Sequence, residues 1–134
     1  MQFLSAAEVN EMARKYFSTD PSLPFADAVL IEDKTLYISG RIGLIPGTRT
    51  VPDTPEEEVY LVMQDLRSVL ALAGMTLDDI VSLQIFASDV SLWERFNAVY
   101  RTYFTGQLPP RAFLGAGTLL FGARFEVQGI AVKE

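Results

Sequence analysis

Two charged residues lie in or beside otherwise apolar stretches of this sequence. Arg111 follows two prolines in PPRAF, and Glu126 lies inside RFEVQGIAV. Proline fixes φ and removes a backbone donor, so the prolines make a stiff approach to Arg111. A guanidinium held in this way suits bidentate binding of a carboxylate, and a carboxylate such as Glu126 can hold a water or a substrate nitrogen. The ordinary alternatives are a solvated arginine and an edge or interface charge, and the local pattern alone favours them.

Other polar residues are weaker candidates. Gln128 shares a strand face with Glu126, because successive side chains of a strand alternate. Ser39 and Gly40 end a predicted strand, where a backbone without a Cβ can approach a ligand closely, although a simple turn explains a glycine equally well. Asn97 is expected on a helix, where an asparagine is typically exposed to solvent.

The composition excludes several kinds of chemistry. The chain has no cysteine and no histidine, so disulfides, thiolate catalysis, Ser-His-Asp triads and zinc sites with Cys or His ligands are ruled out. No metal site is predicted. The net charge of -6 argues against nucleic-acid binding, which depends first on Lys and Arg contacts to phosphates.

The length and hydropathy of the chain predict one domain spanning residues 1–134. No apolar run approaches the roughly 20 residues that a bilayer-crossing helix needs. The N-terminus lacks the basic and apolar regions of a secretory signal, so a cytoplasmic protein is expected.

The elements that position these residues can be predicted from periodicity and caps. A short amphipathic helix is expected over 6–17, with Ser5 and Glu8 as its capping box, followed by a linker to residue 23. A longer helix begins after Thr54, with Glu57 completing its box, and Gly74 stops it. The other expected elements are a hairpin of strands 28–31 and 35–42, a strand within 78–89, a helix capped by Ser91 and Glu94, and strands 111–117 and 124–132.

This order predicts an α+β fold with a single mixed sheet. The two longer helices follow strands and are expected to cover one face of the sheet. The other face also carries many apolar residues, so we expect a second subunit to bury it.

The order and spacing of the motifs are more specific than any one residue. YISGRIGLIPGT is followed by the AG…LDDIV turn, FNAVYRTYF, PPRA and FEVQGIAV, and over about residues 24–134 this arrangement resembles the RidA/YjgF family of reactive intermediate deaminases. The resemblance implies a chorismate-mutase-like fold. It also implies a homotrimer with its sheets in a central barrel and its active sites in clefts between subunits.

The resemblance further implies an imine deaminase of the 2-iminobutanoate/2-iminopropanoate type. Arg111 would hold the substrate carboxylate and Glu126 would position a water, so that an enamine or imine such as 2-aminoacrylate is hydrolysed to a 2-keto acid and ammonia. Neither a metal nor an organic cofactor is required. The substrate-binding residues implied in the cleft are Phe25, Ser39, Gly40, Arg41, Asn97, Phe113 and Gln128.

Departures from the family pattern leave other functions open. Phe25 stands where the family has a tyrosine, and Ala112 and Phe113 replace a hydroxyl residue and a small residue. One alternative is a non-catalytic trimer that binds small carboxylates or acts as a chaperone-like partner. Ribonuclease activity ranks lower in an acidic chain without histidine. A chorismate-mutase-like rearrangement would rest on the fold alone, which does not determine function.

Overall fold

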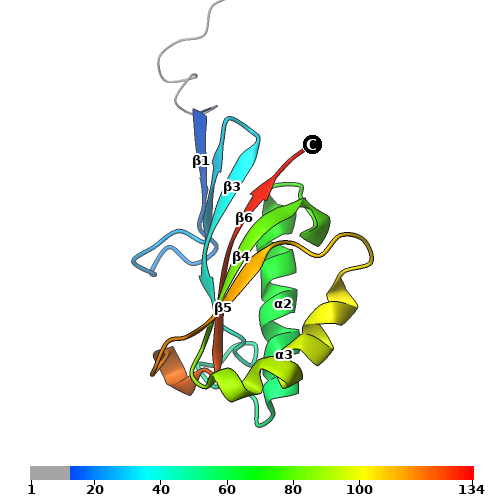
Figure 1. Ribbon diagram of the computed structural model, residues 1–134. Coiled ribbons are helices and arrows are strands. Elements are labelled where there is room, and N and C mark those ends of the chain that lie inside the picture. Colours follow the sequence, from blue (N-terminus) through cyan, green and yellow to red (C-terminus); the bar gives the residue numbers. More distant parts are fainter. Residues whose placement is uncertain (1–12) are drawn as a thin grey trace, which may run out of the picture.

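Six strands form one mixed sheet in the computed structural model, which describes residues 13–134 (Figure 1). The sheet order is β1-β2-β3-β6-β4-β5, and only β4 and β5 are parallel neighbours. The strands are β1 Arg14–Phe17, β2 Ala28–Ile31, β3 Thr35–Arg41, β4 Ile80–Ala87, β5 Arg111–Gly115 and β6 Phe125–Val132. The α+β fold with a single mixed sheet is therefore confirmed.

The predicted N-terminal helix is wrong over its last turn. Residues 14–17 form β1, which pairs antiparallel with β2. The helical spacing of a few apolar residues is a weak signal over so short a segment. The free edge of β2 offers hydrogen-bond partners to the backbone of residues 14–17, and this pairing decides their conformation. The amide of Glu32 donates to the carbonyl of Ala13 at 2.9 Å. The earlier part of the predicted helix, with its cap, lies outside the described residues.

The predicted hairpin is confirmed as β2 and β3. Its turn places Glu32 and Asp33 at φ 52° each, and the amide of Lys34 donates to the carbonyl of Ile31 at 2.9 Å. Two successive residues with positive φ suit the twist of adjacent antiparallel strands. β3 then pairs with β6, and an irregularity in the register falls between Ile38 and Arg41.

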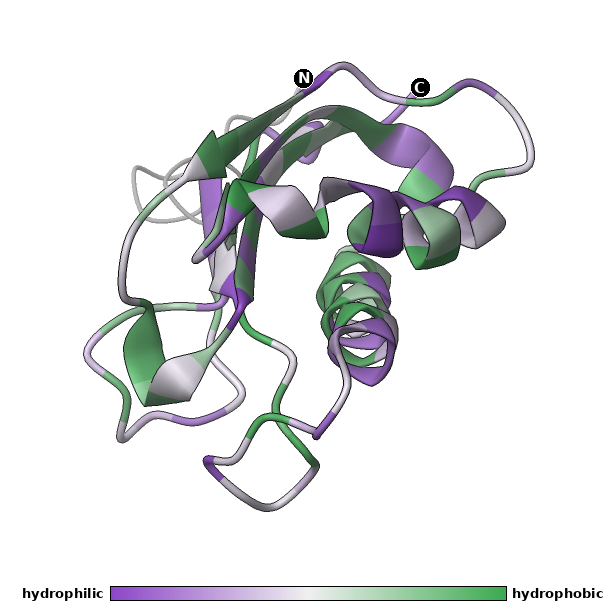
Figure 2. Ribbon diagram, turned by 60° about the horizontal axis from the view of Figure 1, so that its bottom comes forward, coloured by the Kyte–Doolittle hydropathy of each residue, from purple (hydrophilic) through white to green (hydrophobic). Residues whose placement is uncertain are grey.

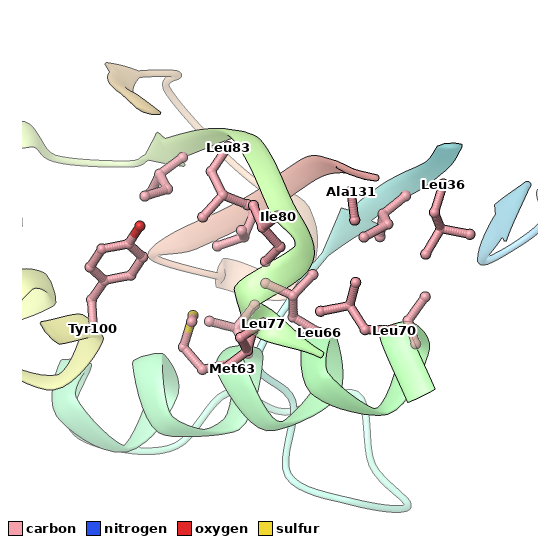
Figure 3. Packing of buried hydrophobic residues seen from close by; sticks show 14 of the residues in the cluster. Leu36, Met63, Leu66, Leu70, Leu77, Ile80, Leu83, Tyr100 and Ala131 are labelled. Atoms are coloured by element: carbon pink, nitrogen blue, oxygen red, sulfur yellow. The ribbon is translucent and has the colours of Figure 1, made fainter. Parts of the chain in front are cut away.

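The long helix α2, Pro55–Leu72, begins and ends where the sequence predicts. The Thr54 hydroxyl accepts a hydrogen bond from the amide of Glu57, and Gly74 adopts φ +71° just after the helix. One face of α2 is buried against the sheet. In Figure 3, Met63, Leu66 and Leu70 of this face point toward Leu36, Ile80 and Ala131 of the strands.

The second helix, α3 Trp93–Tyr100, has a different start from the one predicted. The predicted capping box of Ser91 and Glu94 is absent, because a 3-10 turn, Val90–Leu92, precedes the helix. The side chain of Asp89 accepts from the amide of Ser91 at 2.9 Å and caps that turn instead. Other 3-10 turns lie at Leu77–Asp79, Arg101–Tyr103 and Leu120–Gly122.

Both helices cover the same face of the sheet, as Figure 2 shows. α2 connects β3 to β4, and α3 connects β4 to its parallel neighbour β5. The opposite face, called here the open face, has no covering element among residues 13–134. It carries partly exposed Tyr37 and Leu114 beside Gln84 and Gln128. None of the helices in this part of the chain has the length and apolar character that a bilayer crossing requires.

Candidate functional site

A large cavity lies beside the end of β3 and the start of β6. Its volume is about 810 Å³, and residues of the 20–27 segment, α2 and the turn at Leu120 also line it. Six of the nine predicted site residues share this cavity: Phe25, Ser39, Gly40, Arg41, Glu126 and Gln128. We call it the Glu126 cavity. The sequence therefore identified residues that the fold brings together from three separate segments.

Gly40 and Glu126 lie in contact across two neighbouring strands. A Cβ placed on Gly40 would lie 2.9 Å from both Cδ and Oε2 of Glu126. The carboxylate thus occupies the space that a side chain at position 40 would fill. None of the ion pairs among the described residues involves Glu126. Its carboxylate is consequently open to a water or a ligand.

Ser39 and Arg41 flank Gly40 and hold the end of β3 in place. The Ser39 hydroxyl donates to the carbonyl of Ala26 at 2.6 Å. Nη1 of Arg41 lies 2.9 Å from Asp27, and its Nε lies 2.5 Å from Asp65 of α2. Both side chains are therefore engaged by the protein itself, and Arg41 contributes to the cavity mainly by fixing its wall.

Asp27 remains ionised within this cluster. Burial acts to raise the pKa of Asp27, but hydrogen bonds from the amide and hydroxyl of Thr19 and the charge of Arg41 outweigh it and hold the pKa below its ordinary value. The ion pair thus stays intact at neutral pH. Neither Asp27 nor Asp65 was predicted, since nothing in their spacing links them to Arg41.

Arg111 lies away from the Glu126 cavity, on the helix-covered side of β5. Its Nη2 donates to Oδ1 of Asn97, and its Cζ lies 4.6 Å from the ring centroid of Tyr100. Burial lowers the pKa of Arg111, because desolvation disfavours the charged form, although an arginine remains protonated at neutral pH. The expectation of an exposed Asn97 is wrong, because this residue is only 6% exposed.

A second, smaller cavity of about 170 Å³ opens beside Arg111. Its lining includes Trp93, Asn97, Tyr100 and Pro109. Nη1 of Arg111 is buried and has no hydrogen-bond partner among the described residues. Phe113, two residues along the strand, packs edge-on against Phe96 at 5.6 Å between ring centroids, so it forms a wall behind the arginine.

Arg111 and Glu126 face opposite sides of the sheet. Arg111 is in register with Leu83 on β4, whereas Glu126 is in register with Phe86 on the same strand. Positions 83 and 86 of β4 point to opposite faces, because side chains alternate along a strand. Leu83 is buried under the helices at 1% exposure, which places Glu126 on the open face. One chain cannot present both side chains to the same small ligand.

Glu58 is a buried carboxylate that sequence reasoning missed. It lies on α2 with no exposed surface and accepts hydrogen bonds from the amides of Arg124 and Phe125 at 2.7 and 3.1 Å. Nη1 of Arg124 donates to its other oxygen at 2.8 Å. These bonds fix the start of β6, immediately before Glu126. The only sequence signal was a glutamate on the apolar side of a helix.

Known proteins resemble this chain over nearly its whole length. A 2-iminobutanoate/2-iminopropanoate deaminase of Mus musculus is 33% identical over 130 residues, which cover 93% of this chain and 96% of the mouse protein. Protein DfrA of Myxococcus xanthus is 34% identical over 131 residues, covering 93% of this chain and 100% of DfrA. The solved structure of YyfA from Yersinia pestis, a Rid family protein, matches with a TM-score of 0.82 and 30% identity, covering 90% of this chain and 100% of YyfA.

The profile of the family described as Endoribonuclease L-PSP matches residues 17–133. The chain belongs to the RidA/YjgF family. The resemblance inferred from the motifs is thereby confirmed, as is the chorismate-mutase-like fold. Relatives within the RidA/YjgF family at about one-third identity are named as imine deaminases.

Proposed function

We propose that this protein hydrolyses 2-imino acids, and their enamine tautomers, to 2-keto acids and ammonia. The observation that carries the proposal is a pair of separated polar sites. Nη1 of Arg111 has no partner among the described residues, and the carboxylate of Glu126 forms no ion pair there. A 2-imino acid offers a carboxylate for the first and an imine carbon and nitrogen for the second. The names of the relatives within the family support the same reaction.

The two sites come together in a homotrimer. A second copy that packs on the open face brings its own Arg111 to the Glu126 cavity of its neighbour, which one chain cannot do alone because the two side chains face opposite ways. Tyr37 and Leu114 on the open face are 47% and 43% exposed in the single chain. Their burial between subunits is favourable, as for any apolar surface removed from water.

The reaction needs few groups from the protein. Water adds to the imine carbon, a proton moves to the nitrogen, and the C–N bond breaks to release ammonia and leave the keto group. Glu126 holds the attacking water and transfers the proton, while Arg111 fixes the carboxylate and thereby the position of the carbon. The backbone at Gly40 allows the carboxylate of Glu126 to lie beside the end of β3.

The experiment is to generate 2-iminobutanoate or 2-iminopropanoate in the assay with an amino-acid oxidase and to follow its decay. We expect the protein to accelerate decay at catalytic concentrations. A protein that binds the keto acid but leaves the decay rate unchanged would be a carboxylate-binding trimer instead. That is the competing assignment within this family, and it uses Arg111 without requiring Glu126.

Endoribonuclease activity is a second candidate, because the family description carries that name. The charge of -6 and the lack of histidine make it the weaker one, since RNA cleavage requires phosphate binding and acid–base groups. Incubation with a labelled single-stranded RNA tests it. Cleavage that persists in Glu126→Gln but is absent from a mock purification would favour it.

A further inference from the structure

Two neighbouring side chains each carry a buried polar atom that has no hydrogen-bond partner in the described part of the chain. The two atoms are Nη1 of Arg111 and the hydroxyl of Tyr100. Buried polar atoms are nearly always paired, because an unpaired one costs free energy. The mechanism above uses Arg111 but gives Tyr100 no role. A buried hydroxyl without a partner, next to an arginine that we expect to bind substrate, indicates that this hydroxyl forms its hydrogen bond when substrate is bound.

Tyr100 is firmly placed. It is 4% exposed, and its ring packs against Phe96 at 5.5 Å and Phe104 at 4.9 Å between centroids. Figure 3 shows its side chain reaching from α3 toward the sheet with the hydroxyl foremost. Burial raises the pKa of Tyr100, so the phenol keeps its proton at neutral pH.

We propose that Tyr100 is a positioning residue for Arg111, which rests on the proposed binding of the substrate carboxylate by that arginine. The ring supports the guanidinium at 4.6 Å, within the range of a cation–π contact. Asn97 already accepts one N–H of Nη2. In the liganded arrangement the Tyr100 hydroxyl accepts one N–H of Nη1.

This arrangement leaves one N–H on each terminal nitrogen of Arg111. Those two donors point the same way and match the two oxygens of a carboxylate, which is the strong bidentate geometry. Without the hydroxyl, Nη1 would be held on one side only by the ring, and the guanidinium plane would be free to rotate away from the carboxylate. Tyr100 therefore affects binding of the substrate rather than the chemical step.

The test is Tyr100→Phe, which keeps the ring and removes only the hydroxyl. The control is Tyr103→Phe, which removes a phenol from the next turn, where the ring lies 5.1 Å from Arg67 and away from Arg111. KM and kcat are measured with 2-iminobutanoate, the dissociation constant with its hydrolysis product 2-oxobutanoate, and Tm without ligand. For Tyr100→Phe we expect KM and the dissociation constant to rise about tenfold, as for a lost hydrogen bond to a charged group.

A residue of purely structural importance would give a different result. We expect kcat of Tyr100→Phe to stay within about twofold and Tm to be unchanged or higher, because the substitution removes an unpaired buried group. Unchanged KM and dissociation constant, an equal change in Tyr103→Phe, or a fall in Tm of more than about 5 °C would overturn the proposal. A variant that does not fold would overturn it as well.

The proposed function can fail separately. If the wild type does not accelerate imine decay, the proposed deaminase function is wrong. The dissociation constants of the wild type and of Tyr100→Phe for 2-oxobutanoate still show whether Tyr100 positions Arg111. A wild type that binds no 2-oxobutanoate would overturn both.

Discussion

At the scale of single residues, the carboxylate of Glu126 is the group proposed to hold the water and transfer the proton. Glu126→Gln keeps the size of the side chain and its hydrogen bonding but cannot take a proton. We expect kcat to fall about 10²–10⁴-fold, the usual contribution of a general acid–base group, while the dissociation constant for 2-oxobutanoate changes little. Steady-state rates and calorimetric titration measure the two quantities. An undiminished kcat would remove Glu126 from the mechanism.

Arg111 is expected to contribute through its shape as well as its charge. Arg111→Ala should lower kcat/KM on the order of 10²–10³-fold, as for loss of a hydrogen-bonded charge pair, and Arg111→Lys should recover little of it. Lysine cannot hold Asn97 and two carboxylate oxygens at once in the planar geometry of the guanidinium. Circular dichroism is measured to check that both variants fold. Wild-type activity in Arg111→Lys would contradict bidentate recognition.

At the scale of elements, the site is held by the packing of α2 against the starts and ends of strands. Two glutamates in the first turn of α2 make this testable, because each pairs with an arginine at 2.8 Å, one exposed and one buried. Glu58→Ala leaves the amides of Arg124 and Phe125 without their acceptor and removes the buried carboxylate from the guanidinium of Arg124, which keeps only backbone carbonyls as partners. We expect it to lower the free energy of unfolding by about 3–5 kcal/mol. Urea denaturation measures this change.

The matched control is Glu56→Ala, which breaks the exposed pair with Arg95. We expect its unfolding midpoint to remain close to that of the wild type, because solvent and salt screen such a pair. Equal midpoints for Glu56→Ala and Glu58→Ala would show that the buried network does not hold β6 in place.

The sequence predicted most of these elements because their signals are local. Thr54 and Gly74 mark the ends of α2, and the alternation in 124–132 marks β6. Residues 14–17 were misread because their conformation is decided by the edge of β2, which is not local. The face on which Glu126 lies relative to Arg111 depends on the register of three strands, which no single segment encodes. The orphaned hydroxyl of Tyr100 is defined only by its neighbours in space.

At the scale of the whole molecule, we propose that each active site is shared between two subunits. Size exclusion with light scattering should give three times the chain mass of 14.9 kDa. A monomer at micromolar concentration would leave Arg111 and Glu126 on opposite faces with no route to one substrate.

Mixing of two inactive variants tests the shared site most directly. Arg111→Ala and Glu126→Gln are unfolded together, refolded as a mixture and assayed for imine decay beside each variant refolded alone. In a cyclic trimer, every mixed assembly contains one interface with both native residues, so random mixing should restore about a quarter of wild-type activity. A mixture no more active than the two variants refolded separately would contradict a site formed by Arg111 of one subunit and Glu126 of the next.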